Sequence, residues 1–331
     1  MSRVIFSVLI CICAQVGLIQ AGWAQGGSAK AQDKYPSRPV KIIVPSPPAG
    51  GTDIIARVLA QRFSTVFGQQ FIVENRPGAG NMIGIESVAR SPNDGYTLLM
   101  VPSTLALNSV LYKKVNYDPI KDFAPITIAA TAPNVLVINP QVPANTLAEF
   151  IALVKKKPGE LTYGTPGAGT SPHMSMELFK SMAGLDIQHI PYRGTAPAVT
   201  DIISGQIHAM FANALTAKPQ VDSGKLRALA VSGPKRIDAL PNVPPVAQAG
   251  VPGYEAMQWY GLLAPAGTPK DIMVRLHAEA TKALQTEDMK EKLATDGAEP
   301  VGSTSAEFAS LIKSELDKWT KVARAAKIEQ Q

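Results

Sequence analysis

Cysteine is nearly absent from this chain of 331 residues, and the two that occur, Cys11 and Cys13, both lie close to the N-terminus. The rest of the chain therefore has no thiol with which to form a disulfide or a thiolate metal site. The four histidines show no spacing that is typical of metal ligands. We therefore expect a fold that supports itself without disulfides, a metal or another cofactor.

Sequence motifs for common enzyme chemistries are missing as well. The chain contains no GxGxxG, GxxxxGK[ST], GxSxG or HExxH pattern, which argues against a dinucleotide site, a P-loop, a hydrolase elbow and a zinc protease. A Ser/His/Asp triad can be assembled from residues far apart in the chain and would leave no such spacing. Nothing in the sequence recommends one.

The charge pattern argues against a nucleic-acid partner. The chain has 32 basic and 26 acidic residues, and without Arg3 of the N-terminal segment the balance is 31 − 26 = +5. A nucleic-acid surface needs a basic stripe or stacking aromatics, but aromatics are only 6% of the residues and the charges are interspersed. The short run Lys155, Lys156 and Lys157 is expected to be a solvated face with mild attraction for anions.

The N-terminus has the pattern of a secretory signal. Arg3 is followed by an apolar run over residues 4–14 and by small residues at Gly22 and Ala24. A membrane anchor is the alternative, but a spanning helix needs about 20 apolar residues. Neither cysteine follows the small residues of a lipoprotein cleavage site. We expect residues 1–24 to be removed after Ala24 and the mature protein to be periplasmic.

Short β-rich segments alternate with helical patterns along nearly the whole chain, which indicates βαβ units with largely parallel sheets. About 300 mature residues exceed what one hydrophobic core usually serves, so two domains are expected. Residues 123–147 carry no charge, but their four prolines argue against a membrane span, and the second series of units begins within this stretch at residue 135. The strands are predicted at residues 40–44, 71–73, 97–101, 135–138, 161–164 and 187–190, with helices starting near Thr52, Asn81, Leu147 and Pro172.

Helix boundaries carry local signals. Thr146 with Glu149 and Thr304 with Glu307 have the spacing of a capping box. Thr268-Pro269 predicts an N-cap followed by proline at the first helical position. In the last helix, an apolar stripe at helical spacing predicts core packing.

Two glycine-rich turns, residues 44–53 (VPSPPAGGTD) and 164–173 (GTPGAGTSPH), each join a predicted strand to an amphipathic helix. Glycine lets a backbone approach a ligand closely, and the N–H groups at a helix start attract anions. Either turn could instead be a tight connection only. Asp53 is expected to cap its own helix and to pair with Arg57 four residues on, because a carboxylate aimed at an anion would oppose binding.

Several blocks together resemble the Bug-type receptors, the TctC-like extracytoplasmic solute-binding proteins of tripartite tricarboxylate transporters. The resemblance covers nearly the whole mature chain and is specific for the family, though not for a ligand. The blocks are residues 44–57 (VPSPPAGGTDIIAR), 74–81 (ENRPGAGN) with Gly84, 94–99 (DGYTLL), 121–126 (KDFAPI), 163–173 (YGTPGAGTSPH) and 191–194 (PYRG).

The resemblance implies an α/β periplasmic-binding-protein fold of type II, in which two α/β lobes enclose a ligand cleft. It implies a small carboxylate held between helix N-termini of both lobes, often through water, and membrane permease subunits as partners. We expect lobe 1 at residues 34–135 plus 258–331, lobe 2 at 136–257, and a monomer. The implied ligand-binding residues are Gly50, Gly51, Thr52, Asp53, Gly80, Asn81, Ser103, Thr104, Gly169, Thr170, Ser171 and His173.

Two departures from the family pattern leave the ligand class open. Ser46 stands where the family often has a large aromatic residue, and Ala49 where glycine is frequent. His173 either donates to the ligand or is bonded within its own lobe. Arg193 can pair with a carboxylate bidentately or form a structural salt bridge.

We therefore expect a receptor that closes around a dicarboxylate, a tricarboxylate or an aromatic carboxylate without covalent chemistry. An exported hydrolase or lyase acting on a small acid is one alternative, but the loops offer mainly Gly, Ser, Thr and Pro. A periplasmic sensor that feeds a signalling partner is another, and the sequence does not separate it from transport.

Overall fold

The structure is a computed structural model that describes residues 35–48, 50–294, 297–326, 328 and 330. The expected signal peptide, its cleavage site and Ala49 lie outside the described residues. Residues 38–331 form one compact unit, and all the elements named below belong to it.

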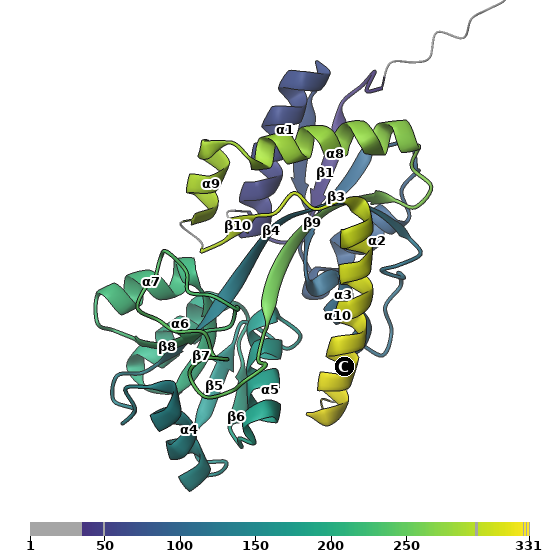
Figure 1. Ribbon diagram of the computed structural model, residues 1–331. Coiled ribbons are helices and arrows are strands. Elements are labelled where there is room, and N and C mark those ends of the chain that lie inside the picture. The colour runs from purple at the N-terminus through teal and green to yellow at the C-terminus, as the bar shows by residue number, and fades with distance from the viewer. Residues whose placement is uncertain (1–34, 49, 295–296, 327, 329, 331) are drawn as a thin grey trace, which may run out of the picture. The chain divides into compact units, whose positions relative to one another are not determined.

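The first half of this unit is built on three parallel strands (Figure 1). The middle strand, β1, pairs with β2 on one side and with β3 on the other. Helices after each strand make the crossovers, as the alternating sequence pattern predicts. We call this part the first lobe. Its elements are β1 (Val40–Val44), α1 (Gly51–Phe67), β2 (Phe71–Asn75), the 3₁₀ turn η1 (Ala79–Asn81), α2 (Met82–Ala89), β3 (Thr97–Pro102) and α3 (Thr104–Leu111).

The second half, which we call the second lobe, repeats the same construction. Strand β5 pairs in parallel with β6 and β7, and helices again follow the strands. Its elements are α4 (Leu147–Lys156), β5 (Thr162–Thr165), α5 (Ser171–Ala183), β6 (Gln188–Pro191), α6 (Thr195–Ser204), β7 (Ala209–Asn213), α7 (Ala214–Asp222) and β8 (Arg227–Val231).

Two long strands join the halves: β4 (Phe123–Ile138) and β9 (Met257–Pro265) (Figure 1). From Phe123 to Pro133, β4 pairs antiparallel with β9, and from Asn134 onward it pairs with β7 and β8. Strand β9 also pairs antiparallel with β3. The expectation of parallel sheets therefore holds within the βαβ units, whereas the joining strands make the sheet mixed.

The sequence prediction placed only residues 135–138 of β4 in a strand. Its proline-rich first half was assigned to no element, and proline is rare inside a sheet because it cannot donate to a ladder. In the structure, the register shifts next to Pro125, and Pro133 is the last β4 residue paired with β9. The prolines thus occupy a bulge and the point where β4 exchanges neighbours, two places where a missing N–H is tolerated.

The C-terminal part adds β10 (Glu299–Pro300) and three helices, α8 (Lys270–Leu284), α9 (Glu287–Ala294) and α10 (Ser305–Ala325). The capping box of α10 is confirmed in both directions between Thr304 and Glu307. At α4, the Thr146 hydroxyl accepts from Glu149 as predicted. Helix α8 begins one residue later than predicted: Pro269 is its N-cap, while the Thr268 hydroxyl donates to the Pro265 carbonyl.

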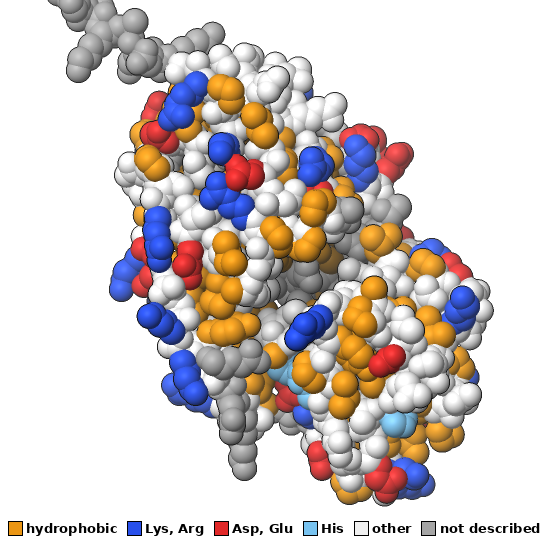
Figure 2. Space-filling model, turned by 180° about the vertical axis from the view of Figure 1, so that it is seen from behind, with side chains coloured by type: hydrophobic (Ala, Val, Ile, Leu, Met, Phe, Trp, Pro, Cys, Tyr) orange, Lys and Arg blue, Asp and Glu red, His pale blue; other side chains and the backbone are white. Residues whose placement is uncertain are grey.

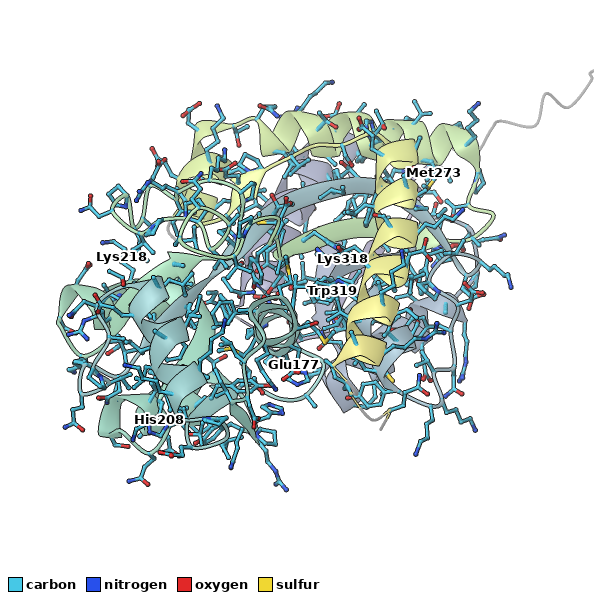
Figure 3. The ribbon with its side chains drawn as sticks, turned by 60° about the horizontal axis from the view of Figure 1, so that its bottom comes forward. Glu177, His208, Lys218, Met273, Lys318 and Trp319 are labelled. Carbon is cyan, nitrogen blue, oxygen red and sulfur yellow. The ribbon has the colours of Figure 1, made fainter. Side chains whose placement is uncertain are left out.

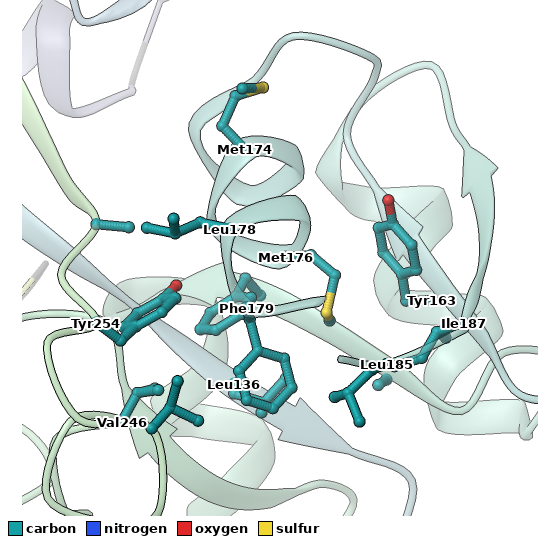
Figure 4. Packing of buried hydrophobic residues seen from close by; sticks show 14 of the residues in the cluster. Leu136, Tyr163, Met174, Met176, Leu178, Phe179, Leu185, Ile187, Val246 and Tyr254 are labelled. Atoms are coloured by element: carbon teal, nitrogen blue, oxygen red, sulfur yellow. The ribbon is translucent and has the colours of Figure 1, made fainter. Parts of the chain in front are cut away.

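Hydrophobic clusters fill both lobes. In the second lobe, Met174, Phe179 and Leu178 of α5 pack with Tyr254 and with strand residues beneath them (Figure 4). A separate cluster in the first lobe packs Ile43 and Leu99 of the sheet with other buried residues. Across the described residues, no helix combines the length and the apolar character that a membrane crossing requires.

Candidate functional site

A cavity of about 330 Å³ lies where the carboxyl ends of the parallel strands of both lobes face each other. Figure 2 shows the surface hollowed between the two lobes. Ligands of open α/β sheets bind in the crevice beyond these strand ends. The described residues that line it are Ser46, Pro47, Gly50, Gly51, Thr52, Pro102, Ser103, Thr104, Asn134, Pro166, Thr170, Ser171, Pro172, Thr195, Ala212, Asn213, Gln258 and Tyr260.

Five helices begin in the wall of this cavity: α1 and α3 from the first lobe and α5, α6 and α7 from the second. No side chain caps the starts of α1, α3, α5 and α6, and only α7 is capped, by Asn213. Uncapped first-turn N–H groups and the positive ends of the helix dipoles favour an anion. Other hollows of comparable volume occur on the described chain, but the convergence of helix starts distinguishes this one.

Two hydroxyl groups in the first-lobe wall are buried without a partner. Ser46 follows β1 and Ser103 follows β3, and neither Oγ atom has a hydrogen-bond partner among the described residues. Buried polar side chains are normally hydrogen-bonded. Since both residues line the cavity, each hydroxyl can donate to a bound anion.

Gly80 and Asn81, which the resemblance implied as ligand-binding residues, do not line the cavity but support its wall. The Asn81 amide donates to the Thr104 hydroxyl at 2.9 Å, which leaves the Thr104 O–H free to donate elsewhere. The Gly80 carbonyl accepts from Asn108 at 2.8 Å. Both residues have positive φ angles, 62° at Gly80 and 77° at Asn81, so this turn uses the two residue types that adopt such a backbone most readily.

Asp53 is buried and turned away from the cavity. Its carboxylate accepts from Arg57 at 2.8 Å and from the Asn75 amide at 3.0 Å, so the predicted pairing with Arg57 is confirmed. The predicted cap is wrong: the N-cap of α1 is Gly50, and Asp53 lies in the first turn of the helix. Asn75 also donates to the Ser46 carbonyl at 3.0 Å. Asp53 therefore helps to fix the turn that carries Ser46.

In the second lobe, Thr170 and Ser171 line the cavity, whereas Gly169 and His173 lie behind them. His173 is 4% exposed, and its Nδ1 accepts from the Gly169 N–H at 3.1 Å. His173 was expected either to donate to the ligand or to be bonded within its own lobe, and the structure shows the bond within the lobe. Arg193 is exposed, does not line the cavity, and makes no ion pair with any residue in the described ranges.

The cavity floor contains residues that sequence reasoning missed. Asn134 of β4 donates to the hydroxyls of Ser171 and Ser175 at 2.9 and 3.0 Å, which ties the joining strand to the start of α5. Gln258 and Tyr260 come from β9. These residues reach the site because β4 and β9 pair with each other and with both lobes. The sequence near them carries no signal for that long-range pairing. Asn213 was findable, because asparagine after a strand and before a helix is a typical N-cap.

The wall carries many hydroxyl and amide groups on a mostly apolar surface, and it has almost no ionisable group. Among the described lining residues there is no Asp, Glu, Lys, Arg, His or Cys, and general acid–base or nucleophilic catalysis usually needs one of these. No group of three or more His, Cys, Asp or Glu residues within the described ranges is placed to hold a metal ion. The arrangement can bind an anion through neutral donors.

Comparison with known proteins places the chain in a family. Residues 55–328 match the family model described as the tripartite tricarboxylate transporter family receptor. Protein BugT of Bordetella pertussis is 38% identical over 294 residues, which are 88% of this chain and 90% of BugT.

Solved structures agree with this assignment. R. palustris Rpa4515 with adipate matches with a TM-score of 0.80 and 37% identity over 89% of this chain and 99% of that one. MatC from Rhodopseudomonas palustris with bound malate matches with a TM-score of 0.76 and 30% identity over 87% and 99%. The predicted two-lobed fold and the family resemblance are both confirmed: the chain belongs to the tripartite tricarboxylate transporter receptor family.

Proposed function

We propose that this protein is a periplasmic receptor that captures a small dicarboxylate in the cavity between its lobes. The observation that carries the proposal is the convergence of uncapped helix starts from both lobes on one cavity. Neutral N–H and O–H donors in a water-poor site bind a carboxylate well without a buried cation. The ligand residues are the lining members of the implied set: Gly50, Gly51, Thr52, Ser103, Thr104, Thr170 and Ser171, together with Ser46.

Donors on two opposing walls favour a ligand with an acid at each end. The first-lobe wall offers the starts of α1 and α3 with the unpartnered hydroxyls of Ser46 and Ser103. The second-lobe wall offers the starts of α5, α6 and α7. A monocarboxylate would accept hydrogen bonds from the donors of one wall only. The relatives with adipate and malate bound are in keeping with this preference.

Binding is proposed to involve closure of lobe 1, residues 34–135 plus 258–331, on lobe 2, residues 136–257. Strands β4 and β9 would act as the hinge, since both connect the two sheets. Closure excludes water and strengthens the hydrogen bonds to the ligand. The remaining parts of the proposal are a cleaved signal peptide at residues 1–24, a monomeric receptor that delivers its ligand unchanged, and permease subunits as recipients.

The test is a ligand screen on protein refolded to remove any retained ligand. Adipate is compared with hexanoate, and malate with 2-hydroxybutyrate, so that the members of each pair differ only in the second acid at equal chain length. We expect stabilisation by RT ln(1 + [L]/Kd) with the diacids and at least about tenfold weaker binding of the monoacids, or about 1.4 kcal/mol. Ser103→Ala should weaken diacid binding. Equal binding of both members of each pair would contradict the two-walled site, and a chemically altered ligand on recovery would contradict the receptor.

A further inference from the structure

The loop over residues 166–170, which leads from β5 into α5, forms part of the cavity wall. Pro166 and Thr170 line the cavity, and Ser171 follows as the first residue of α5. We call residues 166–170 the α5 loop. The Thr170 hydroxyl donates within the loop, to the Gly167 carbonyl at 2.8 Å. The conformation of the loop therefore decides where the donors of Ser171, at the start of α5, point.

Two histidines lie on the protein side of this loop. His173 Nδ1 accepts from the Gly169 N–H at 3.1 Å. His189 stacks on His173 with 4.3 Å between ring centres, and its Nε2 lies 2.7 Å from the Thr165 hydroxyl. That hydroxyl accepts from the Gly167 N–H at 3.3 Å. The pair therefore holds the loop at two points, directly at Gly169 and through Thr165 at Gly167.

The bond at Gly169 lies where the loop has a backbone conformation that glycine adopts readily and other residues do not. Gly169 has a φ of +77°, and a Cβ placed there would lie 3.0 Å from Leu111 of α3. The residue is buried, so its N–H has no access to bulk water. Leaving a buried donor without an acceptor costs about 1–3 kcal/mol, which a loop avoids by turning the peptide elsewhere.

His173 is suited to accept this bond under ordinary conditions. An acceptor at Nδ1 requires the neutral ring with its proton on Nε2. Burial, assisted by His189 and Lys180, lowers the pKa of His173 to about 3. The ring therefore stays neutral near pH 7, and Nδ1 keeps its lone pair.

We propose that His173 is a positioning residue: by accepting from Gly169 it holds the α5 loop in the conformation that presents Ser171 and the start of α5 to the ligand. This rests on the proposed function, since affinity is its main readout. His173 itself contributes no donor to the ligand, because it does not line the cavity.

A matched pair of variants separates the hydrogen bond from the shape of the side chain. In His173→Asn, the amide oxygen stands as many bonds from Cα as Nδ1 does and can accept. In His173→Leu, a methyl group of similar size takes that place and accepts nothing. His208→Leu is the control. Its Nδ1 accepts from the Thr162 N–H at 3.1 Å, a bond of the same kind in the same lobe, but at the opposite end of β5 from the cavity (Figure 3).

The experiment measures adipate affinity by calorimetry and amide hydrogen exchange of residues 167–171 in the parent and the three variants. His173→Leu should bind at least about tenfold more weakly, as expected for a lost buried bond, and should lose protection at Gly169. His173→Asn should restore both, and His208→Leu should match the parent in both.

Parent-like affinity and protection in His173→Leu would overturn the proposal. So would equal losses in the Leu and Asn variants, because these would point to the ring and not to its acceptor. If the parent binds no dicarboxylate, the proposed function fails, and hydrogen exchange still decides the role of His173: protection lost only in the Leu variant supports it, and unchanged protection refutes it.

Discussion

Acid should destabilise this protein through His173 in a pH range that can be derived from its environment. The ring has an ordinary pKa of 6.5, and burial, with the nearby His189 and Lys180, lowers it to about 3 in the folded protein. At pH 7 the ring is mostly neutral in both the folded and the unfolded chain, so its titration hardly changes the free energy of unfolding. As the pH falls below 6.5, the unfolded chain takes up the proton and the folded chain does not, so stability is lost until the pH nears 3.

The size of the effect follows from the width of that interval. Between pH 6.5 and about pH 4.5, two pH units at about 1.4 kcal/mol each give a loss of about 3 kcal/mol. Protonation of carboxylates contributes as well, but it cancels when the parent is compared with His173→Asn at each pH. Urea unfolding followed by circular dichroism gives the free energy of unfolding of both proteins. The difference, parent minus His173→Asn, should be constant above pH 7 and should be lower by about 3 kcal/mol at about pH 4.5. Parallel curves for the two proteins would refute the assigned burial of a neutral His173.

Three further predictions concern the walls of the cavity. A Cβ at Gly50 meets no atom within 4 Å, and the φ there is an ordinary −88°, so Gly50→Val should keep the unfolding midpoint and weaken dicarboxylate binding by about tenfold. Gly169→Ala should instead lower stability by about 1–2 kcal/mol because of its positive φ, which thermal unfolding measures. Ser46→Phe should weaken adipate binding while sparing malate, because the ring replaces the small Ser46 side chain at the cavity wall and takes up volume that the longer ligand needs; equal losses by calorimetry would show that Ser46 does not set ligand size.

The helix starts that build the site were predictable because their signals are local. A strand, a glycine-rich turn and an amphipathic helix follow one another within a few residues at Gly50–Gly51 and at Gly169–Thr170, and the structure brings both turns to one cavity. Parallel strands end at the same edge of a sheet, so the helix starts within each lobe are expected to gather there. The meeting of the two lobes depends on the long strands β4 and β9. The pairing of Asp53 with Arg57 was equally local, at helical spacing.

The floor of the cavity was not predictable, because it depends on pairings between distant segments. Asn134 lies where β4 leaves β9 for β7 and β8, and nothing near it in the sequence marks that exchange. The role of His173 likewise required His189 and the conformation of Gly169 to be known together. Sequence alone offered two roles for that histidine and no physical ground for choosing.

The apolar stripe of helix α10 was predicted correctly, but the sequence does not show which parts of the fold it contacts. The apolar stripe marks one buried face, but its two ends serve different cores. Phe308 and Ile312 pack with the sheet of the first lobe, whereas Trp319 packs in the cluster of Met174 and Leu178 from α5 (Figure 3). A change in the angle between the proposed lobes must therefore either repack Trp319 or carry the end of α10 along with the second lobe. Because Trp319 shares that cluster with Leu107 and Leu111 of α3 in the first lobe, we expect the end of α10 to stay with lobe 1 and its contacts with α5 to repack as β4 and β9 bend.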